Sequence, residues 1–158
     1  MRLLLIALGL LITTWQAYAD PTSPFLQSSG GMYWWDDEPE RSVKITVSAH
    51  NKSTILVEFT PAPDVYLYRN RIKFRISRPD DISVSGIELP DGELINDPTF
   101  GDTRVFSKPF SSFVNLKREP GTSNQLKLYV SYMGSTDKGV RSPVVSKTFD
   151  LEMPDITP

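Results

Sequence analysis

The sequence predicts an all-β fold, an immunoglobulin-like β-sandwich of about seven to nine antiparallel strands, and two observations lead to this prediction. Apolar and polar residues alternate with a period of two from Ser42 onward, which is typical of strands with one buried face. Clusters of Pro, Gly, Asp and Asn interrupt the alternation at short intervals, and no stretch has the period of an amphipathic helix. Many short strands separated by such turns favour two packed antiparallel sheets.

Residues 1–19 have the features of a secretory signal peptide. One basic residue, Arg2, precedes an apolar run from Leu3 to Ile12, and the segment ends with the small residues Ala17 and Ala19 around Tyr18. The apolar run is short for a membrane span, and no later segment is apolar enough to be one. We therefore expect cleavage before Asp20, export to a bacterial periplasm, and no transmembrane segment after cleavage.

Residues 20–41 are predicted to form an N-terminal arm, because they are rich in Pro, Ser, Gly and acidic residues and have no regular apolar period. The arm contains Trp34 and Trp35, which either cover an edge of the sandwich or form a secondary docking segment for a partner. The acidic run 36–38 lacks the spaced ligands and central glycine of a calcium loop, so we expect no metal there.

The sandwich itself is expected to extend over residues 42–153, followed by a C-terminal tail at 154–158. Its first strands present apolar residues at alternate positions, which are Val43, Ile45, Val47 and Ala49, then Ile55, Val57 and Phe59, and then Val65, Leu67, Ile72, Phe74 and Ile76. The last two strands contain Leu126 to Tyr132 and Val145 to Leu151. Between them lies a polar loop, which we expect to be exposed, with Ser135 and Arg141 at its two ends.

Composition excludes several kinds of chemistry. The chain has no cysteine, so it forms no disulfide, no thiolate metal site and no thiol nucleophile. His50 is the only histidine, and no nucleophile elbow or phosphate-binding loop is present, so we expect no catalytic residue and no cofactor. The formal net charge of −2, with acidic and basic residues interspersed, argues against binding to nucleic acid.

Three stretches, at residues 65–72, 89–101 and 132–143, resemble the N-terminal periplasmic domain of the thiol:disulfide interchange protein DsbD. The first reads VYLYRNRI, the second contains LPDG and DPTFG, and the third begins with YMGS and ends at Pro143. The resemblance covers roughly residues 42–153 in order and spacing. It implies an immunoglobulin-like domain that passes electrons from a membrane domain to thioredoxin-fold partners through two cysteines at the ends of a hairpin.

The chain departs from that family at the residues that matter most for redox chemistry. By resemblance, Ser135 and Arg141 stand at the positions of the two cysteines. Disulfide exchange needs a thiolate, so the family's redox activity is not expected here. Thr99, Phe100 and Gly101 match the Phe-Tyr-Gly run of the loop that caps the cysteines, with threonine in place of the capping phenylalanine.

The resemblance therefore implies a binding domain without redox activity. The candidate contact face comprises Tyr66, Tyr68, Thr99, Phe100, Ser135 and Arg141, where the two tyrosines are those that the family keeps beneath the cysteine site. The expected partner is another periplasmic or inner-membrane protein of a thiol-reducing or cytochrome-maturation system, with a thioredoxin-fold protein as one candidate. Two alternatives remain open: a structural or chaperone-like sandwich that pairs an edge strand with a client, and an enzyme that uses carboxylates not singled out by spacing.

Overall fold

The structure is a computed structural model that describes residues 42–156. The predicted signal peptide, the arm with Trp34 and Trp35, and the last two residues lie outside the described residues. Within residues 42–156, no helix is long and apolar enough to cross a membrane.

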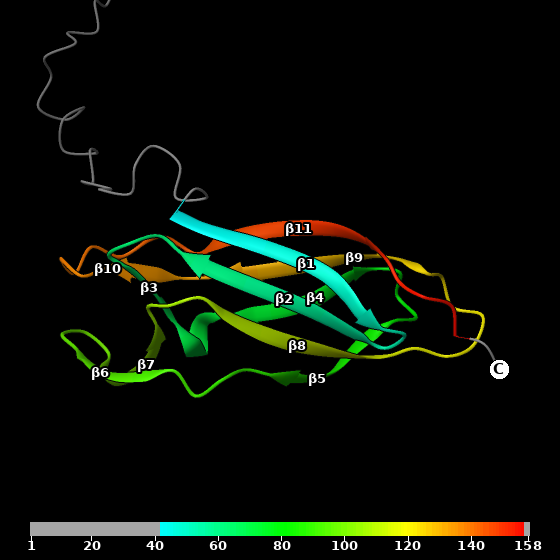
Figure 1. Ribbon diagram of the computed structural model, residues 1–158, viewed down its shortest axis with the longest axis horizontal. Coiled ribbons are helices and arrows are strands. Elements are labelled where there is room, and N and C mark those ends of the chain that lie inside the picture. The colour runs from blue at the N-terminus through cyan, green and yellow to red at the C-terminus, as the bar shows by residue number, and fades with distance from the viewer. Residues whose placement is uncertain (1–41, 157–158) are drawn as a thin grey trace, which may run out of the picture. The chain divides into compact units, whose positions relative to one another are not determined.

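The described residues form eleven β-strands and one short 3-10 helix, so the all-β prediction is confirmed. Figure 1 shows the strands, which are β1 (Val43–Asn51), β2 (Thr54–Pro61), β3 (Val65–Tyr68), β4 (Lys73–Arg78), β5 (Ser83–Glu88), β6 (Glu93–Asp97), β7 (Gly101–Phe106), β8 (Phe110–Lys117), β9 (Gln125–Tyr132), β10 (Gly134–Thr136) and β11 (Val145–Glu152). The helix η2 spans Arg69–Arg71. All pairings are antiparallel, in sheets of order β1-β2-β8-β5, β10-β3-β7-β6 and β11-β9-β4.

The core lies between the first and third of these sheets. Apolar side chains at alternate positions of β2 are fully buried, and those of β9 face the same interior; they are Ile55, Val57 and Phe59 on β2 and Leu126, Leu128 and Val130 on β9. Phe59 of β2 meets Phe74 of β4 edge to face, with ring centroids 6.2 Å apart. The period-two pattern thus becomes the inner face of each sheet, as the sequence predicts.

The structure has more strands than the expected seven to nine, because the alternation of apolar residues in the sequence does not resolve the short strands. Residues 65–76 look like one apolar run, yet η2 divides them into β3 and β4, which belong to different sheets. β10 has only three residues and is paired to β3, so no periodic pattern predicts it. Local alternation reports burial, but it does not report which sheet a strand joins.

The sheet β10-β3-β7-β6 lies at one end of the molecule, at the left of Figure 1, and is joined to the sandwich by aromatic rings. Phe106 of β7 stacks on Phe110 of β8 at 3.8 Å, and Phe110 stacks on Phe59 at 4.8 Å. Gly92 has φ of 72°, and an added Cβ would lie 2.6 Å from the carbonyl oxygen of Val105. Only glycine fits this close approach of the loop before β6 to strand β7.

Candidate partner-binding site

The two ends of the loop that follows β9 lie opposite each other. Ser135 and Arg141 form an isolated antiparallel bridge. The N–H of Thr136 donates to the carbonyl of Val140, and the N–H of Ser142 donates to that of Gly134, both at 2.9 Å. Because these bonds flank the bridge, Ser135 and Arg141 are a non-hydrogen-bonded pair, the type in which opposite Cα atoms are closest, at about 4.5 Å.

Arg141 belongs to a network with two buried side chains from other strands. The hydroxyl of Tyr68, at the end of β3, donates to Asp97 Oδ2 at 2.7 Å. Arg141 donates from Nη2 to Asp97 Oδ1 at 3.1 Å and from Nε to Tyr68 Oη at 3.4 Å. Tyr68 and Asp97 are 0% and 3% exposed, so a charged pair sits at the edge of the interior with its acidic member fully covered.

Asp97 is a central residue that sequence reasoning missed. Besides its side-chain partners, Oδ1 accepts the backbone N–H groups of Thr99 and Phe100 at 2.8 and 2.9 Å. An aspartate that caps its own turn in this way is an Asx turn, and the available signal was the Asp97-Pro98 dipeptide. That dipeptide indicates a turn, but it does not indicate that the same carboxylate binds Tyr68 and Arg141.

The environment shifts the pKa of each member of the network. Burial acts to raise the pKa of Asp97, but hydrogen bonds from the Phe100 N–H, the Tyr68 hydroxyl and the Thr99 N–H, with the charge of Arg141, outweigh it and lower the pKa to about 2. Burial, followed by the hydrogen bond to Asp97, raises the pKa of Tyr68 to about 12. The hydrogen bond with Tyr68 raises the pKa of Arg141 against the effect of burial. Near neutral pH the network is therefore a neutral phenol between a carboxylate and a guanidinium.

Phe100 lies above this network and is 38% exposed. Its ring meets Tyr68 edge to face, with centroids 5.2 Å apart and planes at 87°. The guanidinium carbons of Arg141 and Arg71 lie 5.0 and 5.3 Å from the centroid of Phe100. An exposed aromatic ring is thus held by a buried tyrosine and two cations, a geometry that fixes its orientation.

The structure brings together the residues of the predicted face, but it does not expose them all. Thr99 and Phe100 are exposed and Arg141 is half-buried, whereas Tyr68 and Ser135 are buried. Tyr66 is half-buried and meets Tyr68 with ring centroids 5.5 Å apart. The Ser135 hydroxyl is turned away from solvent and donates to the carbonyl of Val140 at 3.1 Å. The accessible part of the face is therefore Thr99, Phe100 and Arg141, with part of Tyr66.

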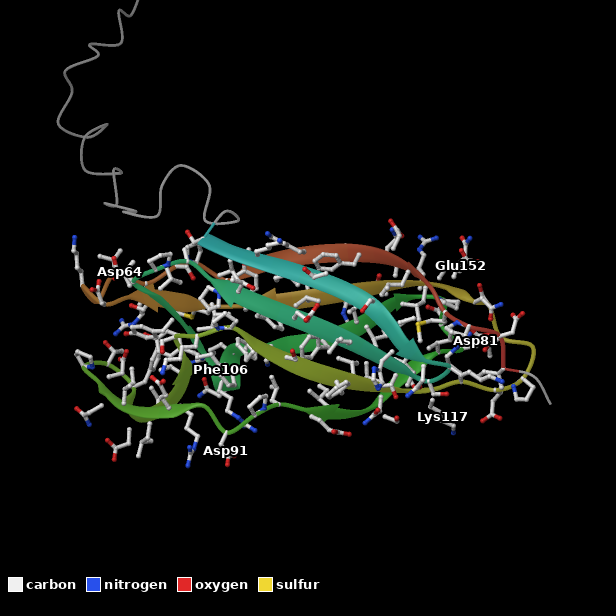
Figure 2. The ribbon with its side chains drawn as sticks, in the orientation of Figure 1. Asp64, Asp81, Asp91, Phe106, Lys117 and Glu152 are labelled. Carbon is white, nitrogen blue, oxygen red and sulfur yellow. The ribbon has the colours of Figure 1, made fainter. Side chains whose placement is uncertain are left out.

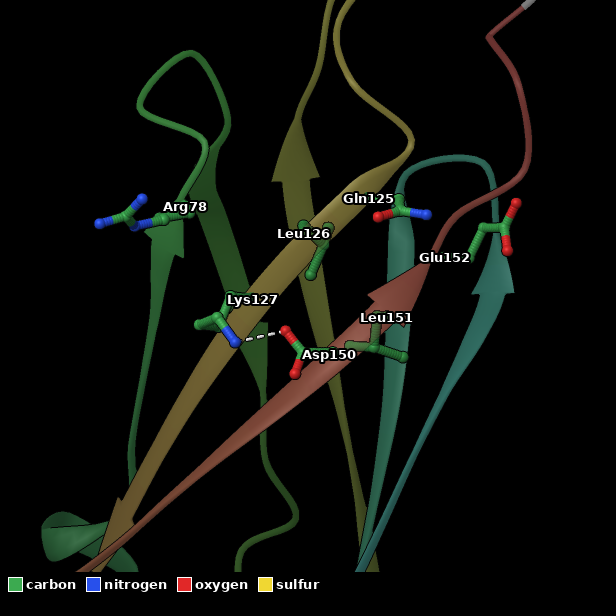
Figure 3. Close-up of a pocket in the computed structure, with 7 residues that line it drawn as sticks. All are labelled: Arg78, Gln125, Leu126, Lys127, Asp150, Leu151 and Glu152. Carbon is green, nitrogen blue, oxygen red and sulfur yellow. Dashed lines mark hydrogen bonds and ion pairs between the residues drawn. The ribbon is translucent and has the colours of Figure 1, made fainter.

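Two of the pockets on the described residues show what else the surface offers. One, of about 380 Å³, is lined by Asp64, Thr136, Asp137, Lys138 and Val140. The other, of about 340 Å³, is lined by residues of β4, β9 and β11, where Lys127 and Asp150 form an ion pair (Figure 3). Figure 2 shows Asp64 and Glu152, one from each pocket, toward opposite ends of the molecule. Residues 42–156 hold no group of three His, Cys, Asp or Glu that could bind a metal ion.

Comparison with known families decides the relationship. The family model described as the N-terminal region of the thiol:disulfide interchange protein DsbD matches residues 38–153. The chain belongs to this family. The DsbD N-terminal resemblance read from the three sequence stretches is thereby confirmed.

Full-length relatives in the DsbD family are much longer than this chain. Thiol:disulfide interchange protein DsbD 1 of Pseudomonas aeruginosa is 31% identical over 122 residues, which are 75% of this chain and 20% of that protein. The DsbD of Colwellia psychrerythraea is 34% identical over 103 residues, 65% of this chain and 16% of that protein. The chain thus spans a fifth or less of the length of these relatives.

Two solved structures share the DsbD N-terminal fold with this chain. The reduced form of the Neisseria meningitidis DsbD N-terminal domain has a TM-score of 0.63 at 23% identity, with 73% of this chain and 88% of that chain covered. The complex of that organism's DsbD and PilB N-terminal domains gives 0.57 at 24% identity, with 72% and 84% covered. Both likenesses support the immunoglobulin-like fold.

The raised pKa of Tyr68 predicts a loss of stability in alkali. In the unfolded chain the phenol ionises near its ordinary pKa of 10, whereas in the folded chain it stays protonated until about pH 12. The folded state therefore binds more protons in this window, and the free energy of unfolding should fall as pH rises from 10 to 12. Urea unfolding at a series of pH values measures this slope. The Tyr68→Phe variant should lack its part of the slope, and an identical slope in both proteins would contradict the assignment.

Proposed function

We propose that this chain is a non-catalytic periplasmic binding domain that docks on another envelope protein through the face around Phe100. One observation carries the proposal: an exposed aromatic ring is held in a fixed orientation over the buried Tyr68–Asp97–Arg141 network. Interface energy concentrates in a few aromatic and arginine side chains, especially where they are already ordered before binding.

The composition of the chain supports binding over disulfide exchange. Exchange begins with attack of a thiolate on a disulfide sulfur, and this chain contains no cysteine. Ser135 stands where the resemblance has the first cysteine, but its hydroxyl is buried and bonded to the carbonyl of Val140. A serine hydroxyl becomes a nucleophile when an adjacent general base takes its proton, whereas the hydroxyl of Ser135 is bonded to backbone carbonyls. The hairpin nevertheless sets Ser135 opposite Arg141, and Arg141 lies against the ring of Phe100.

Relatives support an envelope protein as the partner. The DsbD N-terminal domain of Neisseria meningitidis is seen in a complex with the PilB N-terminal domain, so a domain of this fold docks on a second protein. The predicted signal peptide at residues 1–19 supports a periplasmic location. We therefore propose a periplasmic or inner-membrane partner, with a thioredoxin-fold protein of a thiol-reducing or cytochrome-maturation system as the first candidate to test.

The test is calorimetry with a partner isolated from envelope extracts. Replacing Phe100 or Arg141 by Ala should weaken binding by about 1 to 3 kcal/mol, which is about fivefold to 150-fold in Kd. Ile87→Ala is a matched control, because Ile87 is also an exposed apolar residue (44%) but lies on β5 in another sheet. Unchanged affinity in both loop variants would exclude this face and leave the arm of Trp34 and Trp35, or a strand edge, as the contact.

Edge-strand pairing is a second candidate function, and one observation favours it. β5 and β6 are edge strands of their sheets, and their residues Ile87 and Leu94 are 44% and 63% exposed. An exposed apolar edge can accept a strand from another chain. Leu94→Pro would then abolish binding because proline removes a ladder donor, while Phe100→Ala would have no effect. Docking through the Phe100 face predicts the reverse order of effects.

A further inference from the structure

Three arginines cluster at the end of β3, and the structure uses them differently. Arg69 donates to the carbonyls of Pro90 and Leu89 at 2.6 and 3.2 Å, so it holds the loop before β6. Arg141 is paired with Asp97. Arg71 is exposed, and within the described residues no ion pair or hydrogen bond joins its side chain to another group. Its charge is therefore unmatched on this face.

Arg71 and Arg141 both lie against the ring of Phe100, at 5.3 and 5.0 Å from its centroid. Since Asp97 neutralises one of the two charges, the surface around Phe100 keeps one net positive charge from this set. Asp102, on β7 next to the turn, keeps its negative charge and accepts a hydrogen bond from Asn96 Nδ2 at 2.8 Å. A cation beside an apolar ring is less hydrated than one in open solvent, which strengthens its attraction for an anion.

The positive charge is a local feature, because the chain as a whole carries a formal net charge of −2. The beginning of β3 has the opposite character: Asp64 precedes the strand, and the N–H of Asp137 donates to the carbonyl of Asp64 at 3.0 Å. Two acidic residues and one cation, Lys138, thus lie near the start of β3, and Arg71 lies just beyond its end. A partner laid along this strand would be oriented by charge as well as by shape.

We propose that Arg71 and Arg141 bind a carboxylate of the partner protein, an aspartate or glutamate whose apolar neighbour in the partner covers Phe100. This inference rests on the proposed docking function and specifies the chemistry of the partner's surface. A guanidinium presents two parallel N–H donors to a carboxylate, and Arg71 has its full set available. The adjacent ring gives an apolar residue of the same segment a surface to bury. The recognition element is therefore an acidic residue next to a hydrophobic one.

Peptide probes test this chemistry without a purified partner. The folded chain is titrated with acetyl-Leu-Glu-Leu-amide and with its neutral twin acetyl-Leu-Gln-Leu-amide, while NMR follows the arginine Nε–Hε signals. We expect the acidic peptide to shift the signals of Arg71 and Arg141 and to bind about tenfold tighter than the neutral one, with weaker binding at high salt. Equal binding of the two peptides would overturn the proposal.

A pair of variants gives the matched control. Arg71→Gln should weaken binding of the acidic peptide about fivefold or more while the remaining spectrum stays that of a folded chain. Arg75→Gln should have no effect, because Arg75 is also an exposed arginine over an aromatic ring, 4.8 Å from the centroid of Tyr129, but lies on β4. Equal effects of the two variants would show general charge attraction and refute a built site.

Partner binding separates failure of this inference from failure of the proposed function. If Phe100→Ala weakens the partner's binding and Arg71→Gln does not, the docking face stands and the carboxylate inference is wrong. If Arg71→Gln weakens binding of the acidic peptide, but neither Arg71→Gln nor Phe100→Ala changes the partner's affinity, the carboxylate site stands and the docking function falls. Loss of partner binding in both variants, with normal affinity in Arg75→Gln, supports both.

Discussion

The double variant Ser135→Cys/Arg141→Cys should close an intramolecular disulfide under mild oxidation. The two residues form a non-hydrogen-bonded bridge, in which Cα atoms lie about 4.5 Å apart, within the range of about 4.4 to 6.8 Å that a disulfide spans. Closing this short loop should restrict the unfolded chain by about 2 kcal/mol in the loop-entropy model. Thiol titration before and after oxidation, with intact mass, measures the product.

An out-of-register pair controls for chance oxidation. In Ser135→Cys/Val140→Cys the second thiol is one residue from the bridge, and neighbouring side chains in a strand point to opposite faces. We expect this pair to retain free thiols under the same conditions. Free thiols in the bridge variant would mean that the hairpin is misplaced, and with it the assignment of Ser135 and Arg141 to the cysteine positions of the DsbD family.

Among the arginine replacements considered, that of Arg118 should cause the largest loss of stability. Arg118 follows β8 and is 8% exposed. Its guanidinium donates to the carbonyl of Lys52, to the carbonyls of Pro154 and Ser123 at 3.2 and 3.3 Å, and to Asn124 Oδ1 at 3.0 Å. It therefore joins the β1–β2 turn, the β8–β9 loop and the segment after β11.

In Arg118→Ala, four oxygen acceptors lose their donor, and the free energy of unfolding should fall by about 3 kcal/mol or more. Equilibrium unfolding in urea measures the loss. Arg118→Lys should still lose more than half as much stability as Arg118→Ala. A lysine ammonium lacks the planar set of N–H donors with which a guanidinium reaches several carbonyls at once. Arg104→Ala, which removes an exposed arginine with a single bond to the carbonyl of Gly92, should cost well under 1 kcal/mol. Similar losses in Arg118→Ala and Arg104→Ala would contradict the proposed role.

The candidate site could be predicted only in part. For Ser135 and Arg141 the sequence predicted proximity but not the direction of the side chains. Their sequence positions at the two ends of a polar loop placed them together, since a short loop keeps its ends close. The same positions did not reveal that Ser135 turns inward while Arg141 reaches across to Asp97. The structure places Phe100 beside Tyr68 and Arg141, but the contact of Phe100 with Arg71 depends on η2 and the β6–β7 turn coming together.

The sequence by itself determined the all-β class, the inward faces of β2 and β9, the absence of cysteine and, through the resemblance of three stretches, the relationship to the DsbD N-terminal family. The first three are properties of residue type and local period, because alternation fixes which side chains share a face. Only the tertiary structure decided that β3 and β4 belong to different sheets, that Asp97 lies between Tyr68 and Arg141, and that Arg118 joins three distant segments. Each of these features depends on groups that are far apart in the chain. A buried charge needs hydrogen-bond partners, but which groups become its partners is decided only when packing brings the segments together.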